Sequence, residues 1–287
     1  MFYDSIAYIY NQLVPGKARK VGCIVKNRLW SRQEILLCID LYCRLPYRKL
    51  RQTTPEVREL AELLGRTPSA ISMRACNYAS LDPIESKRVK GLVHLAKSDI
   101  SVWNEIHSDW QKFTLEIDQL KRMMINNAIT ANNKVYCETK NQELNISIHF
   151  GGDKEQMVCA RIGQQFFRDA VLTAYGHRCC ITGLHHDTLL VASHIKPWKY
   201  SDPKTERTNP RNGLCLSPLY DKAFDAGLMT LDDQYRVVFS PAIKDCASKQ
   251  VAQRFFHNYG GKKINLPVRF WPESLFLEYH RTNIFNH

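Results

Sequence analysis

The chain has 287 residues, with 40 lysines and arginines against 28 aspartates and glutamates, and a formal net charge of +12. Its 44% hydrophobic and 24% charged residues are ordinary for a folded protein, which excludes wholesale disorder and a collagen-like chain. No apolar stretch approaches the ~18 residues that suggest a membrane span, and the N-terminus lacks the pattern of a secretory signal. We therefore expect a soluble, cytoplasmic protein.

The positive charge is concentrated at the two ends of the chain. Residues 1–82 hold 13 basic and 7 acidic side chains and residues 242–287 hold 7 and 3, whereas residues 83–156 hold 10 of each. Such an excess fits nucleic acid, acidic membranes or mere solubility. The ten cysteines include no Cys-x-x-Cys pair, so we expect reduced, buried thiols and no structural zinc.

Cap and breaker residues predict three helices in the first third of the chain. Ser31 is a candidate N-cap for an amphipathic helix that ends at Leu45-Pro46. Pro55 suits the first turn of a second helix, because its missing N–H needs no partner there. The second helix runs to Gly65, and Pro68 begins a third.

Further helices and a linker are expected in the middle of the chain. Residues 84–129 are rich in helix formers and predict two or three helices. Residues 130–156 are polar and lack a continuous helical or strand pattern, which is typical of a linker with at most one short strand, near 146–150. Another helix is expected over residues 161–175, followed by short strands and turns from Cys180. We therefore expect an α+β protein with domains at 1–82, 83–156 and 157–287.

Residues 57–76 have the spacing of two closely crossing helices. Ala61 is small enough for a close helix contact, Gly65 tolerates the positive φ of a tight turn, and Ile71 returns an apolar side chain to the shared core. The segment resembles helix-turn-helix DNA-binding modules, in which the second helix enters the major groove. The alternative is a helical hairpin that packs on another protein. The resemblance implies DNA contacts from Arg66, Thr67, Ser69, Ser72 and Arg74.

The most informative residues follow an apolar run near position 190. The run delivers His194 to a strand end, and a polar loop leads from there to Asn212. Ser217-Pro218 then signals the start of a helix that carries Asp221 and Asp225 one turn apart. An imidazole can remove a proton from water, and carboxylates can hold a hard divalent cation beside a phosphate. The order strand, loop, strand, helix is a workable phosphodiester-cleaving unit.

Residues 157–241 resemble the HNH, or ββα-metal, endonucleases of bacterial restriction and defence proteins. The resemblance implies that His194 and Asn212 are the catalytic pair, with His194 as general base and Asn212 fixing the loop so that the imidazole points at the scissile phosphate. It also implies that Asp221 is the metal ligand on the helix. The residues that carry the resemblance are Cys180-Ile-Thr-Gly183, Leu190-Val-Ala-Ser-His194-Ile-Lys-Pro-Trp198 and the run from Asn209 to Asp225.

Two departures from the family pattern concern the metal site. Many HNH proteins have an aspartate directly before the general base, where this chain has Ser193. Tyr220 stands beside the expected helix ligand, where related sequences can have histidine. Asp225 supplies a second carboxylate ligand or else has a structural role. We expect Mg²⁺, Mn²⁺ or another divalent cation at this site.

Other residues around the motif have simpler interpretations. His185 and His186 are expected in an exposed turn, and Cys180 and Cys215 in the core. The aromatic tail over residues 266–285 is expected to pack back on the nuclease domain. Phosphate contacts are expected from the cations Arg168, Lys196 and Arg211.

The sequence thus predicts a metal-dependent endonuclease that acts on double-stranded DNA, with no membrane association. A role in restriction or phage defence is implied by the resemblance. The alternatives are a DNA-binding regulator with an inactive HNH unit, suggested by Ser193, and a nuclease acting on RNA or single strands. Because one active site cuts one strand, double-strand cleavage would favour a homodimer, with the uncharged helical middle as a candidate interface.

Overall fold

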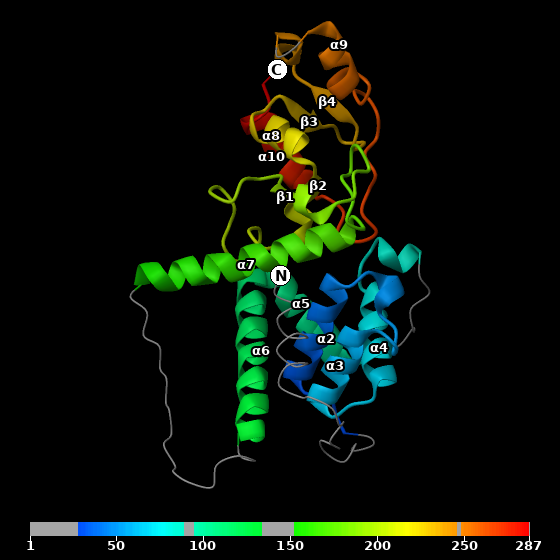
Figure 1. Ribbon diagram of the computed structural model, residues 1–287, viewed down its shortest axis with the longest axis vertical. Coiled ribbons are helices and arrows are strands. Elements are labelled where there is room, and N and C mark those ends of the chain that lie inside the picture. The colour runs from blue at the N-terminus through cyan, green and yellow to red at the C-terminus, as the bar shows by residue number, and fades with distance from the viewer. Residues whose placement is uncertain (1–27, 89–94, 134–151, 246–247, 287) are drawn as a thin grey trace.

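The computed structural model describes residues 28–88, 95–133, 152–245 and 248–286. In Figure 1 a helical module, residues 28–88 and 95–133, lies at one end of the molecule. A strand module, residues 175–245 and 248–286, lies at the other end, and helix α7 (Gly152–Ala174) runs between the two. The expected α+β class is confirmed. None of the described helices has an apolar stretch long enough to cross a membrane.

The helical module begins with three helices at the predicted positions: α2 (Arg32–Arg44), α3 (Pro55–Leu64) and α4 (Pro68–Asn77). The Ser31 hydroxyl accepts from the Glu34 N–H and the Glu34 carboxylate accepts from the Ser31 N–H, so a reciprocal capping box starts α2. Gly65 ends α3 with a left-handed φ of +60°. Thr67 is the N-cap of α4. Local capping chemistry therefore accounts for these boundaries.

Two longer helices complete the helical module: α5 (Lys97–Ser108) and α6 (Trp110–Asn133). Their core contains an aromatic cluster in which the Tyr78 ring stacks on Trp103 at 6.0 Å between centroids. Tyr42 of α2 meets both rings edge-on. The expectation of two or three helices in this region is confirmed for the described residues, and positions 89–94 lie outside them.

Helix α7 contributes to the cores of both modules. Phe166 is fully buried against Phe113 and Trp110 of α6, and the next residue, Phe167, faces the strand module. Successive helix residues point about 100° apart, so neighbouring side chains can pack in different directions. The helix starts at position 152 and α6 ends at 133, so the expected linker at 130–156 is wrong at both ends. The expected strand at 146–150 lies outside the described residues.

The strand module contains the expected order of strand, loop, strand and helix. Strand β1 (Val191–His194) pairs antiparallel with β2 (Gly213–Leu216), and α8 (Pro218–Asp225) follows. The register places His194 opposite Gly213. The remaining elements of the strand module are β3 (Met229–Leu231), β4 (Val237–Phe239), α9 (Lys249–Ala252), the π-helical turn Gln253–His257 and α10 (Ser274–Asn283). Short 3-10 turns lie at Tyr47–Lys49, Tyr78–Ser80, Glu85–Lys87, Asp187–Leu189, Pro210–Asn212 and Pro241–Asp245.

The C-terminal tail packs on both modules. Helix α10 packs on the strand module, where the buried His280 ring stacks on Phe224 of α8. Arg269 instead enters the helical module and donates to the carbonyl oxygens of Tyr42 and Leu45. The expectation that the tail packs back on the nuclease domain is confirmed for α10. The contacts of Arg269 with the helical module were not expected, because its partners lie more than 200 positions away in the chain and leave no local signal.

Candidate active site

His194 is the last residue of β1, and its ring is held on two sides. The Nε2 atom lies 2.9 Å from the carbonyl oxygen of Arg207. Because a carbonyl can only accept, Nε2 carries the proton and Nδ1 keeps its lone pair. The ring stacks on Phe167 at 3.8 Å between centroids, with Trp198 edge-on. Burial lowers the pKa of His194, and the bond to Arg207 opposes part of that shift. The imidazole is therefore neutral at neutral pH and has one basic nitrogen.

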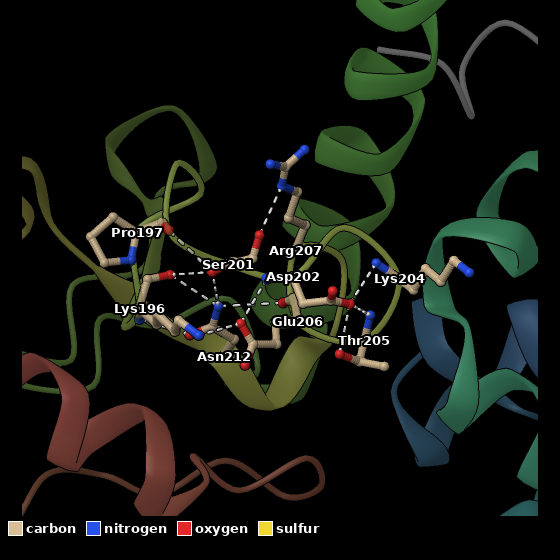
Figure 2. A network of polar contacts seen from close by, with 9 residues as sticks. All are labelled: Lys196, Pro197, Ser201, Asp202, Lys204, Thr205, Glu206, Arg207 and Asn212. Atoms are coloured by element: carbon tan, nitrogen blue, oxygen red, sulfur yellow. Dashed lines mark hydrogen bonds and ion pairs between the residues drawn. The ribbon is translucent and has the colours of Figure 1, made fainter.

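Asn212 is fully buried and fixes the loop that begins after β1. Its Oδ1 accepts from the Lys196 N–H at 2.8 Å, and its Nδ2 donates to the Lys196 carbonyl at 3.1 Å. The same Nδ2 lies 3.2 Å from Ser201 Oγ and 3.3 Å from the Glu206 carbonyl oxygen. Figure 2 shows the amide among these backbone groups. Since Glu206 precedes Arg207, Asn212 holds the segment whose carbonyl orients the imidazole.

The loop over residues 196–207, called the site loop below, carries its own internal bonds. The Asp202 carboxylate accepts from the N–H groups of Lys204 and Thr205, which is the usual capping pattern of a tight turn. The Glu206 carboxylate accepts from the Asp202 N–H and pairs with the Lys196 ammonium at 2.6 Å. The Lys204 carbonyl accepts from the Trp110 N–H at the start of α6. The site loop is thus attached to the helical module as well as to Asn212, the residue before β2.

Helix α8 presents two carboxylates one turn apart. Asp221 is half-buried and Asp225 is exposed. Although the side chain of Asp225 is exposed, the protein around it removes part of its water and raises its pKa, and the like charge of Asp221 raises the pKa further. In the part of the chain that the structure describes, no three histidine, cysteine or acidic side chains form a cluster able to hold a metal. Two carboxylates suit Mg²⁺, which retains several waters and commonly binds one or two protein carboxylates together with substrate phosphate.

Residues 179–232 match a family model described as HNH endonuclease. The chain carries an HNH domain. The matched segment begins 12 residues before β1 and ends directly after β3, so it includes His194, the site loop, Asn212 and α8. No match was found among the curated proteins.

Within the HNH domain and its leading helix, the three predicted phosphate-binding cations have partners in the chain. Arg168 donates to the carbonyl oxygens of Asp187 and Leu190. Lys196 is ion-paired with Glu206, and Arg211 lies 3.5 Å from the Glu273 carboxylate. These contacts support the fold around the site, and phosphate binding by these cations stays a prediction.

The simpler interpretations of residues in the HNH domain are confirmed. Cys180 and Cys215 are buried in its core, and burial raises the pKa of the Cys215 thiol to about 12. His185 and His186 lie exposed in the turn before β1. Ser193, in place of the aspartate of many HNH proteins, is buried, and its Oγ has no hydrogen-bond partner among the described residues.

The predicted DNA-reading residues lie outside the segment that matches the HNH model. Most of them form ion pairs or hydrogen bonds within the chain. The guanidinium groups of Arg66 and Arg74 both lie over the Trp30 ring, at 4.2 and 4.1 Å from its centroid, and form ion pairs with Glu34 and Asp99. A carboxylate from α5 thus neutralises Arg74, and its side chain is largely buried. Thr67 caps α4, the Ser72 hydroxyl donates to the Leu50 carbonyl, and Ser69 is exposed. DNA contact by α4 stays a prediction.

Some residues of the site are not evident from the sequence. Phe167 lies beneath the imidazole, but its signal is only that of an apolar helix position. Arg207 acts through its backbone carbonyl, which any residue type supplies. Trp198 contacts both His194 and the Arg207 guanidinium. A tryptophan directly after a proline in a polar loop is a sequence signal that could have indicated this structural role.

Proposed function

We propose that this protein is a divalent-metal-dependent endonuclease that cuts double-stranded DNA, acts in the cytoplasm and serves in restriction or phage defence. The observation that carries the proposed chemistry is the bond from His194 Nε2 to the Arg207 carbonyl, which leaves Nδ1 as a base in the HNH domain. The defence role rests on the resemblance of the motif to restriction and defence nucleases.

His194 acts as the general base in this proposal. Its Nδ1 takes a proton from a water molecule, and the resulting hydroxide oxygen bonds to the phosphorus while the bond to the leaving sugar oxygen breaks. The imidazolium that forms keeps its Nε2–H bond to Arg207, so the ring does not turn during proton transfer. Asn212 is a positioning residue, since its buried amide binds backbone groups of the site loop.

Asp221 and Asp225 are the residues that would hold the divalent cation. Desolvation and then the charge of Asp221 raise the pKa of Asp225, and a divalent cation held by the two carboxylates would reduce the repulsion between them. When bound, such an ion neutralises phosphate charge and stabilises the leaving oxygen. Ser193 is too weak a donor to replace a carboxylate, so we expect water and substrate phosphate to fill the remaining positions.

DNA reading by α3 and α4, and a homodimer that cuts both strands, are parts of the same proposal. Ser69 is the exposed member of the predicted contact set. The electrically neutral stretch at residues 83–156 supports α5 and α6 as the dimer contact, because like-charged surfaces repel when they meet.

Plasmid nicking tests the enzymatic part of the proposal. With Mg²⁺ or Mn²⁺ we expect nicking by the wild type and a loss of roughly 10² to 10⁴-fold in the His194→Ala variant, the usual contribution of a general base. His185→Ala is the matched control, because it removes an exposed imidazole from the preceding turn and should nick at the wild-type rate. Equal nicking by His194→Ala would overturn the assignment. A wild type that binds duplex DNA without nicking it would favour the DNA-binding regulator.

A further inference from the structure

A group of unpaired cations follows the HNH match in the sequence. Between positions 235 and 265 the chain has six lysines and arginines and one acidic residue, Asp245. Five of these cations are exposed, and none of the five forms an ion pair with any described residue. We call them the basic segment: Arg236, Lys249, Arg254, Lys262 and Lys263.

The cations of the basic segment are held on an ordered scaffold. Arg236 and Lys263 are partners in an antiparallel β-bridge, and the Arg236 guanidinium also donates to the Gly261 carbonyl. Lys249 begins α9, and Arg254 lies in the π-helical turn that continues it. The contrast with Arg66 and Arg74 is clear, because ion pairs neutralise both of those guanidinium groups within the helical module.

The basic segment is joined directly to the helix that carries the proposed metal ligands. Tyr220, the residue before Asp221, donates from its hydroxyl to the Phe255 carbonyl at 2.5 Å. The Tyr220 ring also packs edge-on against Phe256 and Tyr259. In Figure 1 α8, β3, β4 and α9 form one continuous end of the molecule. A polymer bound by this segment would therefore keep a fixed position relative to α8.

We propose that the basic segment binds the phosphodiester backbone of the DNA substrate beside the HNH site. This inference rests on the proposed function, and it adds a binding surface that the HNH match does not include. Unpaired cations on a rigid surface release counterions from DNA and so provide sequence-independent affinity. An anionic membrane is less well matched, because α9 and its π turn expose only Val251 and Phe255 and bury Ala252 and Phe256, whereas a membrane-binding helix presents a broad apolar face.

The test compares two variants that lose the same charge, both in a His194→Ala background so that no DNA is cut. The first carries Lys249→Gln, Arg254→Gln, Lys262→Gln and Lys263→Gln. The control carries Lys87→Gln, Arg88→Gln, Lys97→Gln and Arg122→Gln, four exposed cations of the helical module. Fluorescence anisotropy with a labelled DNA duplex gives the affinity at several salt concentrations, and thermal unfolding checks that both variants are folded.

We expect the first variant to bind at least about tenfold more weakly and its salt dependence to flatten, because each lost phosphate contact removes about 0.9 from the slope of log affinity against log salt. The control should keep the wild-type slope. The inference would be overturned by an unchanged slope in the first variant or by an equal loss of affinity in the control. It would also be overturned if, in a parallel measurement with phosphatidylserine vesicles, the first variant lost binding to the vesicles but not to DNA. A wild type that fails to nick plasmid while the slopes differ as expected would contradict the nuclease proposal alone.

Discussion

The Asn212 side chain uses both ends of its amide in a place closed to water. Its oxygen accepts from the Lys196 N–H, and the atoms within reach of its nitrogen are oxygens of Lys196, Ser201 and Glu206. An amide combines one acceptor and one donor group in this geometry, whereas a carboxylate has acceptors only. The partners around position 212 therefore require a side chain that both accepts and donates a hydrogen bond.

Asn212→Asp should be much less stable than the wild type. The substitution places a carboxylate oxygen against three oxygen atoms, and we expect a loss of about 2–4 kcal/mol in the free energy of unfolding. Urea denaturation measures it, with Asn104→Asp, at an exposed position of α5, as the control. Nicking should fall as well, because the Arg207 carbonyl is no longer held against Nε2 of the imidazole. An unfolding midpoint equal to that of the wild type would contradict the role assigned to this amide.

At the scale of single residues, the sequence predicts side chains better than it predicts their partners. His194 and Asn212 could be singled out because their residue types and spacing are specific. The bond from His194 goes to a backbone carbonyl, which has no signature in the sequence. The ion pairs of Arg66 and Arg74 were missed for another reason, since Glu34 and Asp99 are 32 and 25 positions away.

Among the elements, β2 and α7 lie in close contact near the site. A β-carbon built on Gly213 would lie 2.4 Å from Val171 Cγ2 and 3.0 Å from Phe167 Cζ. Val171 is fully buried and β-branched, so it has little freedom to move aside. The absence of a side chain at position 213 therefore allows the Phe167 ring to reach the imidazole of His194.

Gly213→Ala should push α7 away from the sheet. We expect a loss of roughly 1–3 kcal/mol in the free energy of unfolding, the usual cost of overpacking a core, together with reduced nicking. Gly260→Ala is the control, since its nearest neighbour would be 3.6 Å away. A second substitution, Val171→Ala, makes room for the new methyl group, so the double variant should be more stable than the sum of the two single losses. Additive losses would show that the two positions do not meet.

The boundaries of most elements could be predicted because their causes are local. The capping box at Ser31, the left-handed Gly65 and the Ser217-Pro218 start of α8 are each contained in a few residues. Helix α7 was predicted too short, since its first turns lie in a polar stretch with no capping signal. Its division between two cores depends on tertiary packing, which periodicity alone does not reveal.

At the scale of the whole molecule, Arg269 links the C-terminal tail to the helical module. Its guanidinium is fully buried over the Tyr42 ring, donates to two carbonyl oxygens of the α2 end, and lies 3.5 Å from the Glu85 carboxylate. Glu85 also accepts from the Tyr42 hydroxyl. The last part of the chain thus neutralises a carboxylate in the core of the first part.

Arg269→Met should destabilise the helical module although the substitution lies in the tail. Removing one member of a buried ion pair leaves the other unpaired, and we expect a cost of about 3–5 kcal/mol in the free energy of unfolding. Tryptophan fluorescence should report the change, because Trp103 and Trp110 lie in the helical module. Arg178→Met, at an exposed position, is the control. The idea fails if the variant and the control unfold at the same denaturant concentration.

Phe166 and Phe167 have a consequence for how such a protein can arise. A fragment starting after α7 would lack the ring on which His194 rests, whereas a fragment that included α7 would expose Phe166 to water. The HNH domain is therefore not expected to fold and function apart from the helical module. In a gene fusion, the new adjoining domain would have to bury Phe166 with aromatic side chains of its own. The two halves of this chain are therefore expected to be inherited together.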